Sequence, residues 1–102
     1  MVVLHIEHPI TDFEVWTGAF DRFAERRQAA GVQAERVCRP VDDARYVVAD
    51  LDFPTVEQAE SFLRFLTEVV WAVPANSPAL AGQASGRVLR VERSLRTADR
   101  TS

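Results

Sequence analysis

Several residue types are scarce in this 102-residue chain, and each shortage excludes a class of protein. The single cysteine, Cys38, excludes an intramolecular disulfide, and in an apolar strand we expect it to be a small core residue. Lysine is absent, so all 12 basic side chains are arginines, and they alternate with 15 acidic side chains. The net charge of -3 therefore argues against nucleic-acid binding, which requires a basic face.

Long apolar segments are also missing. No run approaches the roughly 18 apolar residues that a membrane span needs, and no basic segment followed by an apolar run of signal-peptide length opens the chain. We therefore expect a cytoplasmic protein with no membrane contact. His5 and His8 are the only histidines, and no metal-ligand cluster, nucleophile triad or phosphate-binding loop is apparent. We predict neither a metal nor another cofactor.

What the chain does contain is two strand, helix, strand units in tandem. The expected segments are 2–8, 12–30 and 32–39, followed by 45–53, 55–70 and 86–95. The order β-α-β-β-α-β is typical of a ferredoxin-like α+β sandwich, in which an antiparallel four-stranded sheet carries two helices on one face. We assign residues 1–95 to one domain and residues 96–102 to a flexible polar tail.

Capping residues mark the ends of the two helices. Asp12 is a good N-cap for the first helix, Gly31 ends it, and Thr55 with Gln58 has the spacing of a capping box for the second. Trp71 lies off the apolar stripe of the second helix. Either this helix unwinds just before Trp71, or the indole covers a separate surface.

Alternation along the strands predicts which side of the sheet meets the helices. The set expected to pack on the helices is Val47, Ala49, Leu51 and Phe53. The other side would expose Tyr46 and Val48, together with Val3 or its opposite-parity neighbours and with either Val37 or Val88. Monomers seldom expose so much contiguous apolar surface. We therefore predict a homodimer, formed by pairing of the open sheet faces about a two-fold axis.

Polar residues share that open side with the apolar ones. We expect Tyr46 and Asp50 to meet Arg36 or Arg39 across the hairpin, in a cross-strand ion pair or a polar network. A catalytic carboxylate at Asp50 is the alternative. His5 lies on the opposite parity from His8 and is expected at the dimer face or as a buried polar residue.

An ordered set of residues along the chain carries a family resemblance. The set is His8, Asp12, Phe13, Trp16, Phe20, Asp21, Arg27, Arg36, Val37, Arg39, Asp43, 47–53, Ala59, Phe62 and 78–82. It resembles the dimeric α+β barrel superfamily, and within it the small bacterial proteins related to antibiotic biosynthesis monooxygenases, often labelled cyclases. The resemblance implies that two sheets pair into an eight-stranded barrel and that each subunit keeps a cleft between its sheet and its helices.

Members of that superfamily differ in activity. They include oxygenases that act on aromatic polyketides without a bound cofactor, haem-degrading enzymes, isomerases and proteins of no known activity. The haem-degrading branch relies on a histidine in the second half of the chain. Because both histidines here lie near the start, the resemblance disfavours that branch.

Two polar residues are candidates for chemistry in the cleft. His8 ends the first strand, and an imidazole with a pKa near 6.5 is a candidate general base; its alternative role is to tie the loop to a backbone carbonyl. Arg27 continues the apolar stripe near the end of the first helix. It is a candidate clamp for an anionic group, and its alternative is to snorkel and complement the helix dipole.

Five larger side chains are the expected ligand-binding residues: Trp16, Phe20, Phe62, Leu66 and Trp71. Trp16 and Phe20 wall a pocket for a planar ligand or else belong to the core. Trp71 is either a pocket lid or an interface anchor.

These residues favour a homodimer that binds a small apolar or aromatic molecule. The resemblance implies a cofactor-independent monooxygenase, or a cyclase or isomerase, that acts on an aromatic or polyketide-like substrate. The alternative is a non-catalytic ligand carrier or a dimeric accessory protein, in which the same residues form only the core.

Overall fold

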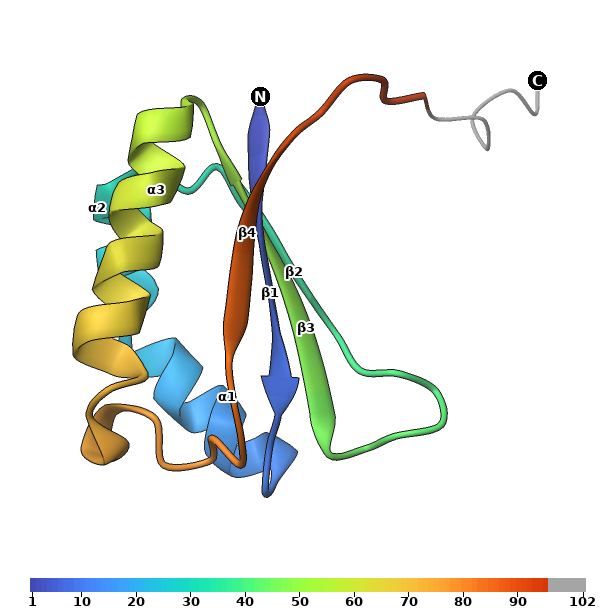
Figure 1. Ribbon diagram of the computed structural model, residues 1–102, viewed down its shortest axis with the longest axis vertical. Helices are drawn as coiled ribbons and strands as arrows, with labels where there is room; N and C mark the ends of the chain where they lie inside the picture. Colours follow the sequence, from blue (N-terminus) through green and yellow to red (C-terminus); the bar gives the residue numbers. More distant parts are fainter. Residues whose placement is uncertain (96–102) are drawn as a thin grey trace.

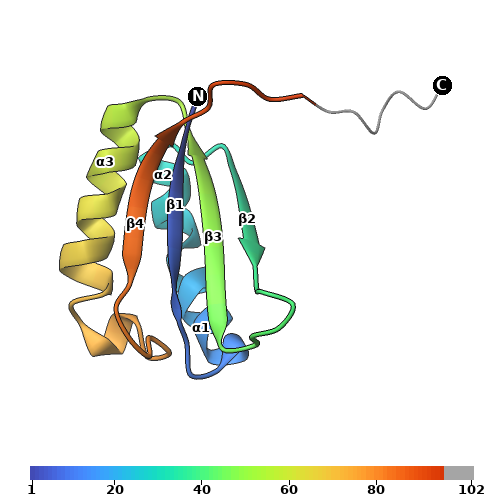
Figure 2. The ribbon, with the colours of Figure 1, turned by 45° about the vertical axis from the view of Figure 1, so that its right-hand side comes forward.

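In the computed structural model, four strands form one antiparallel sheet in the order β2-β3-β1-β4, and the helices cover only one of its faces (Figure 1) (Figure 2). The elements are β1 (Val2–Pro9), α1 (Phe13–Arg22), α2 (Ala24–Ala30), β2 (Ala34–Cys38), β3 (Tyr46–Phe53), α3 (Val56–Phe65), the π-helix η1 (Leu66–Val70), the 3₁₀-helix η2 (Pro74–Asn76) and β4 (Ser85–Arg90). The structure describes residues 1–95, and the tail expected over 96–102 lies outside them. The predicted ferredoxin-like α+β fold is confirmed.

Period-two burial in the central strands builds the core. β1 and β3 pair along their whole length, with Leu4 opposite Leu51, and every second residue of each strand is buried. The buried residues of β3 are the predicted set, Val47, Ala49, Leu51 and Phe53. Burial of these side chains against the helices supplies the main driving force for this arrangement.

The first predicted helix bends at Phe23 and becomes α1 and α2. The carbonyl oxygen of Phe20 accepts hydrogen bonds from the Phe23 N–H at 3.1 Å and from Nη1 of Arg27 at 2.6 Å. An unbroken α-helix would direct that carbonyl to the amide four residues further on. A tertiary contact therefore tightens this turn. The caps are as predicted, because Asp12 accepts from the Val15 N–H and Gly31 adopts a φ of 104°.

The second predicted helix also changes form before its end. α3 begins with the predicted capping pair, in which the Thr55 hydroxyl accepts from the Gln58 N–H at 3.2 Å. After Phe65 the chain widens into the π-helix η1, where the Trp71 N–H donates to the Leu66 carbonyl at 2.7 Å. The helix thus unwinds, as one of the two interpretations of Trp71 expects, and π-turns of this kind are frequent at functional sites.

The open face of the sheet differs from the expectation in two respects. Val37 and Val88 both face the helices, because they pair with the inward residues Ala49 and Leu4. Leu89 lies on the open face instead, opposite Val3. The expected core position of Cys38 is also wrong, since its side chain is exposed on the edge strand β2. In the short strands β2 and β4, apolar residues do not alternate regularly with polar ones, so the sequence does not predict which residues face the helices.

Within residues 1–95, no helix combines the length and the apolar character that crossing a bilayer would require.

Candidate functional site

A cavity lies between the inner face of the sheet and the helices. Its volume is ≈ 60 Å³. A buried water needs about 10–15 Å³ of such space, so the cavity has room for a few waters. The lining residues are Ile6, His8, Trp16, Ala19, Phe20, Phe23, Arg27, Ala49, Val70, Trp71, Asn76, Ser77, Ala79 and Leu80. The site is therefore apolar and largely aromatic, with few polar groups.

His8 presents one free nitrogen to this cavity. The residue is 3% exposed, and its Nδ1–H donates to the Pro9 carbonyl at 3.0 Å. That bond fixes the neutral tautomer in which Nε2 carries a lone pair, and Nε2 has no hydrogen-bond partner among residues 1–95. Burial lowers the pKa of His8, and the Pro9 carbonyl only partly opposes this. The imidazole is consequently a neutral acceptor at pH 7.

Two indoles flank the His8 ring. The ring centroid of Trp16, on α1, lies 6.4 Å from that of His8, and the ring of Trp71 meets it edge-on at 6.3 Å. Gly86 on β4 leaves space for Leu63, because a Cβ at that position would stand 2.6 Å from Cδ1 of Leu63, while it would only be in ordinary contact with the Trp71 indole at 3.6 Å. A planar group that enters the cavity therefore meets the two indoles and the imidazole nitrogen.

The α1 wall of the cavity is a stack of rings. Trp16 stacks on Phe20 with centroids 4.6 Å apart, and on Phe13 with centroids 6.0 Å apart. A guanidinium covers each end, with Arg27 3.6 Å above the Phe20 ring and Arg39 4.0 Å above the Phe13 ring. Stacking and cation–π contacts of this kind hold the Trp16 indole in a fixed plane.

Arg27 is buried and already engaged. Its Nε and Nη2 donate to the two carboxylate oxygens of Glu35 at 2.8 and 3.2 Å, and its Nη1 donates to the Phe20 carbonyl at 2.6 Å. The residue is 4% exposed. The carboxylate that Arg27 holds is thus one from the same chain, on the neighbouring edge strand β2.

Most of the predicted site residues meet at this cavity. His8, Arg27, Trp16, Phe20 and Trp71 all line it. Two predicted ligand-binding residues lie elsewhere: Phe62 is buried in the core against Phe53 and Phe65, and Leu66 packs at the edge of that core. The broad apolar stripe of the second helix does not distinguish its core-facing from its cavity-facing positions.

The sequence interpretation missed the far wall of the cavity. Asn76, Ser77, Ala79 and Leu80 come from an Ala- and Pro-rich connection around η2 and line the site. The side-chain amide of Asn76 donates to the Val69 carbonyl at 2.9 Å, which ties the connection to the end of η1. The length of the connection between η1 and β4 could have indicated a binding role, because long loops often serve binding sites.

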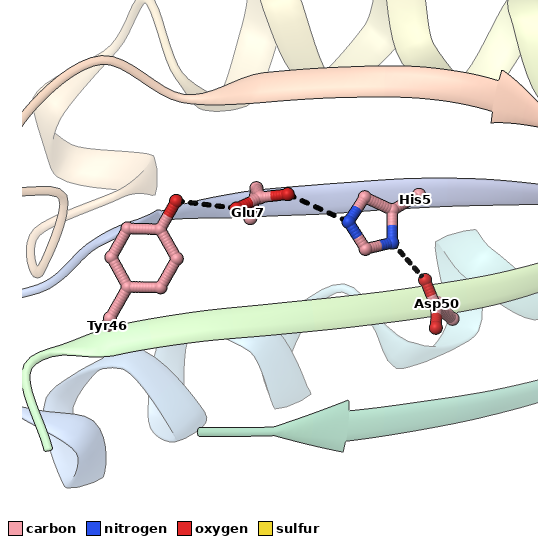
Figure 3. Close-up of polar contacts among 4 residues, drawn as sticks. All are labelled: His5, Glu7, Tyr46 and Asp50. Carbon is pink, nitrogen blue, oxygen red and sulfur yellow. Dashed lines mark hydrogen bonds and ion pairs between the residues drawn. The ribbon is translucent and has the colours of Figure 1, made fainter. Parts of the chain in front are cut away.

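A second polar group, on the open face of the sheet, links four side chains of β1 and β3 (Figure 3). His5 Nδ1 donates to Asp50 at 2.6 Å and His5 Nε2 donates to Glu7 at 2.9 Å, while the Tyr46 hydroxyl donates to Glu7 at 2.7 Å. Asp50 thus pairs with His5, although Arg36 also stands opposite it on β2. The expected partnership of Asp50 with Arg36 or Arg39 is wrong, because the polar network that Tyr46 and Asp50 join is completed by His5 and Glu7.

The hydrogen bonds of this network shift its pKa values. The bond to Glu7 raises the pKa of His5, with Asp50 adding to the effect. The bond from Tyr46 lowers the pKa of Glu7, and the same bond raises the pKa of Tyr46. Both ring nitrogens of His5 face carboxylates, so the network favours the doubly protonated imidazolium. Among residues 1–95, no group of three His, Cys, Asp or Glu side chains is placed to hold a metal ion.

Comparisons with known proteins find likeness at the level of structure. No family model matches the chain, and no curated protein matches it. A structure described as a proposed antibiotic biosynthesis monooxygenase from Nitrosomonas europaea is similar with a TM-score of 0.66 and 15% identity, over 91% of this chain and 100% of that one. A dimeric ferredoxin-like protein from an uncultured marine organism is similar with a TM-score of 0.65 and 8% identity, over 95% of this chain and 100% of that one.

The haem degrader MhuD from Mycobacterium tuberculosis is also similar, with a TM-score of 0.52 and 19% identity, over 92% of this chain and 99% of that one. At these identities the likeness is one of fold. The chain has the ferredoxin-like α+β fold of the antibiotic biosynthesis monooxygenase-like and dimeric ferredoxin-like proteins, as the residue pattern predicts.

Proposed function

We propose that the chain binds a small aromatic molecule in the cavity beside His8, and that Nε2 of His8 accepts a hydrogen bond or a proton from it. The observation that carries this proposal is the Nε2 atom of the buried residue His8, which has no partner among residues 1–95 and is set between two indoles in an apolar cavity. A phenolic O–H or an acidified C–H is the kind of donor that such an acceptor recruits.

The chemistry that this arrangement supports is proton abstraction from a phenol or an activated carbon. The proton moves to Nε2, and the resulting anion is the species that reacts with oxygen, closes a ring or isomerises. The indoles of Trp16 and Trp71 border the ring on either side of His8 and limit how it can lie. We therefore propose a cofactor-independent monooxygenase, or a cyclase or isomerase, and the name of the Nitrosomonas protein supports the first of these.

Phenol is the simplest probe of this proposal. Both tryptophans of the chain line the cavity, so we expect phenol to change their fluorescence on titration and to raise the thermal unfolding midpoint. Cyclohexanol, which has neither the planar ring nor the acidic hydroxyl, serves as the control. No change with phenol up to tens of millimolar, or equal changes with both compounds, would contradict the proposal.

A non-catalytic ligand carrier is the second candidate. It is favoured by the modest volume of ≈ 60 Å³ and by the unpartnered Nε2 of His8, because binding requires no further group. The two candidates separate on oxygen uptake, measured with phenolic compounds that bind: a carrier binds them without consuming oxygen or forming a product.

We propose further that two chains pair through the open faces of their sheets. Two of the similar structures are described as dimeric ferredoxin-like proteins. Val3, Val48 and Leu89 supply apolar contact on that face, and the His5 network supplies fixed polar groups. A mixed surface of this kind is typical of protein interfaces, in which a polar network fixes the register.

Leu89→Asp is expected to shift the protein from the mass of two chains to that of one, because it introduces a charge at the apolar part of the open face. Light scattering after size exclusion at micromolar concentration measures this. Val69→Asp is the matched control, since Val69 is 41% exposed against 42% for Leu89 but lies on η1, on the helical side. A wild-type protein with the mass of one chain contradicts the proposed dimer.

A further inference from the structure

The charge balance of the cavity points to the class of ligand that it admits. Arg27 is the only Lys or Arg side chain among the lining residues, and His8 is neutral there. Glu35 meets the Arg27 guanidinium with both carboxylate oxygens, at 2.8 and 3.2 Å. The fork that would recognise a ligand carboxylate is therefore filled by an internal one.

We infer that Glu35 is a specificity-determining residue: by neutralising Arg27 it makes the cavity select neutral aromatic proton donors and reject aromatic carboxylates. This inference rests on the proposed function, since it concerns ligands of the same cavity. The selection needs no contact between Glu35 and the ligand. It follows from the occupied fork and from the zero net charge of the Arg27–Glu35 pair.

Geometry explains why Glu35 reaches this position. Arg27 lies on α2 and Glu35 on β2, and the turn at Gly31 brings the two elements side by side. Glu35 pairs with the inward residue Leu51, so its side chain leaves the edge strand on the helical face. Its side chain is 39% exposed against 5% for that of Arg27, so solvent hydrates the Glu35 carboxylate but not the Arg27 guanidinium.

Phenol and benzoate are matched probes that differ in charge, the property for which Glu35 is proposed to select. Phenol brings a neutral O–H to Nε2 of His8. Benzoate brings a charge that loses its water in the cavity and finds the Arg27 fork filled by Glu35. An unpaired buried carboxylate is strongly disfavoured. The wild-type protein is therefore expected to bind phenol at least about tenfold more tightly than benzoate, the ratio that one charge-assisted hydrogen bond supplies.

Glu35→Gln tests the inference by leaving the cation without its counter-charge. We expect the affinity for benzoate to rise about tenfold or more, with little change for phenol, in tryptophan fluorescence titrations. Benzoate should then raise the thermal unfolding midpoint of E35Q but not that of the wild type. Glu25→Gln makes the same charge change at an exposed position of α2 and is expected to leave both affinities unchanged.

The double variant R27M/E35Q removes the cation as well and is expected to lose the gain for benzoate. Equal wild-type affinities for phenol and benzoate, or no gain in E35Q, overturn the inference while phenol binding leaves the proposed function standing. If neither probe binds any variant, the proposed function fails and this inference fails with it. The wild-type ratio requires no variant, so equal affinities overturn the inference even if E35Q does not fold.

Discussion

Replacing His8 with asparagine is expected to weaken phenol binding by about tenfold and to slow any reaction that begins with proton abstraction by about 10²- to 10⁴-fold. The asparagine amide can donate to the Pro9 carbonyl in place of Nδ1, which holds the end of β1 as His8 does. The acceptor at the position of Nε2 is lost. Fluorescence titration and oxygen uptake measure the two effects.

A second substitution at the same position separates chemistry from folding. His8→Gln places an amide oxygen within reach of the position of Nε2, so phenol binding is expected to recover in part while proton abstraction does not. If His8→Asn leaves phenol affinity intact, the role of His8 is to tie the loop to the Pro9 carbonyl, and the proposed acceptor role is wrong.

The pH dependence of His8 follows from its lowered pKa. The unfolded chain binds a proton at this residue near pH 6.5, whereas the folded protein binds it only at lower pH, so His8 reduces stability as the pH falls below 6.5. Phenol binding is expected to be lost at a lower pH than the ordinary histidine pKa of about 6.5, because the folded imidazole takes up its proton only at lower pH. His5, with its raised pKa, contributes in the opposite sense. The comparison of wild type with His8→Asn isolates the His8 effect.

Local sequence rules predict the framework of this protein well. Period-two alternation in β1 and β3 is strong, since each strand buries every second residue, and it places His8 on the inward side with Leu4 and Ile6. The caps at Asp12, Gly31 and Thr55 depend only on neighbouring residues.

Features that depend on tertiary contacts escape those rules. The bend at Phe23 requires the Arg27 guanidinium to reach the Phe20 carbonyl, and the partner of Arg27 is a glutamate on another element. One contact of the polar network is predictable from the sequence, because His5 and Glu7 are two residues apart on one strand and therefore share a face. That Asp50 meets His5 rather than Arg36 depends on side-chain geometry across three strands.

Phe62 is another residue whose position depends on tertiary packing, since it lies in the core and not at the cavity. Its side chain is 4% exposed and packs at the centre of the helical layer, with ring centroids 5.9 Å from Phe53 and 5.5 Å from Phe65. Truncation of a buried phenylalanine costs about 3–5 kcal/mol, because transfer free energy is lost and a cavity remains. For a domain whose total stability is about 5–15 kcal/mol, this is a large fraction.

Phe62→Ala is therefore expected to lower the free energy of unfolding by about 3–5 kcal/mol in urea titrations, without changing the phenol affinity of the protein that stays folded. Val15→Ala, at a residue 46% exposed on α1, is expected to change stability by less than about 0.5 kcal/mol. The opposite result, normal stability with weakened phenol binding, would place Phe62 in the ligand site. Because the ring contacts Phe53 behind the cavity wall and does not line the cavity, the structure favours the loss of stability.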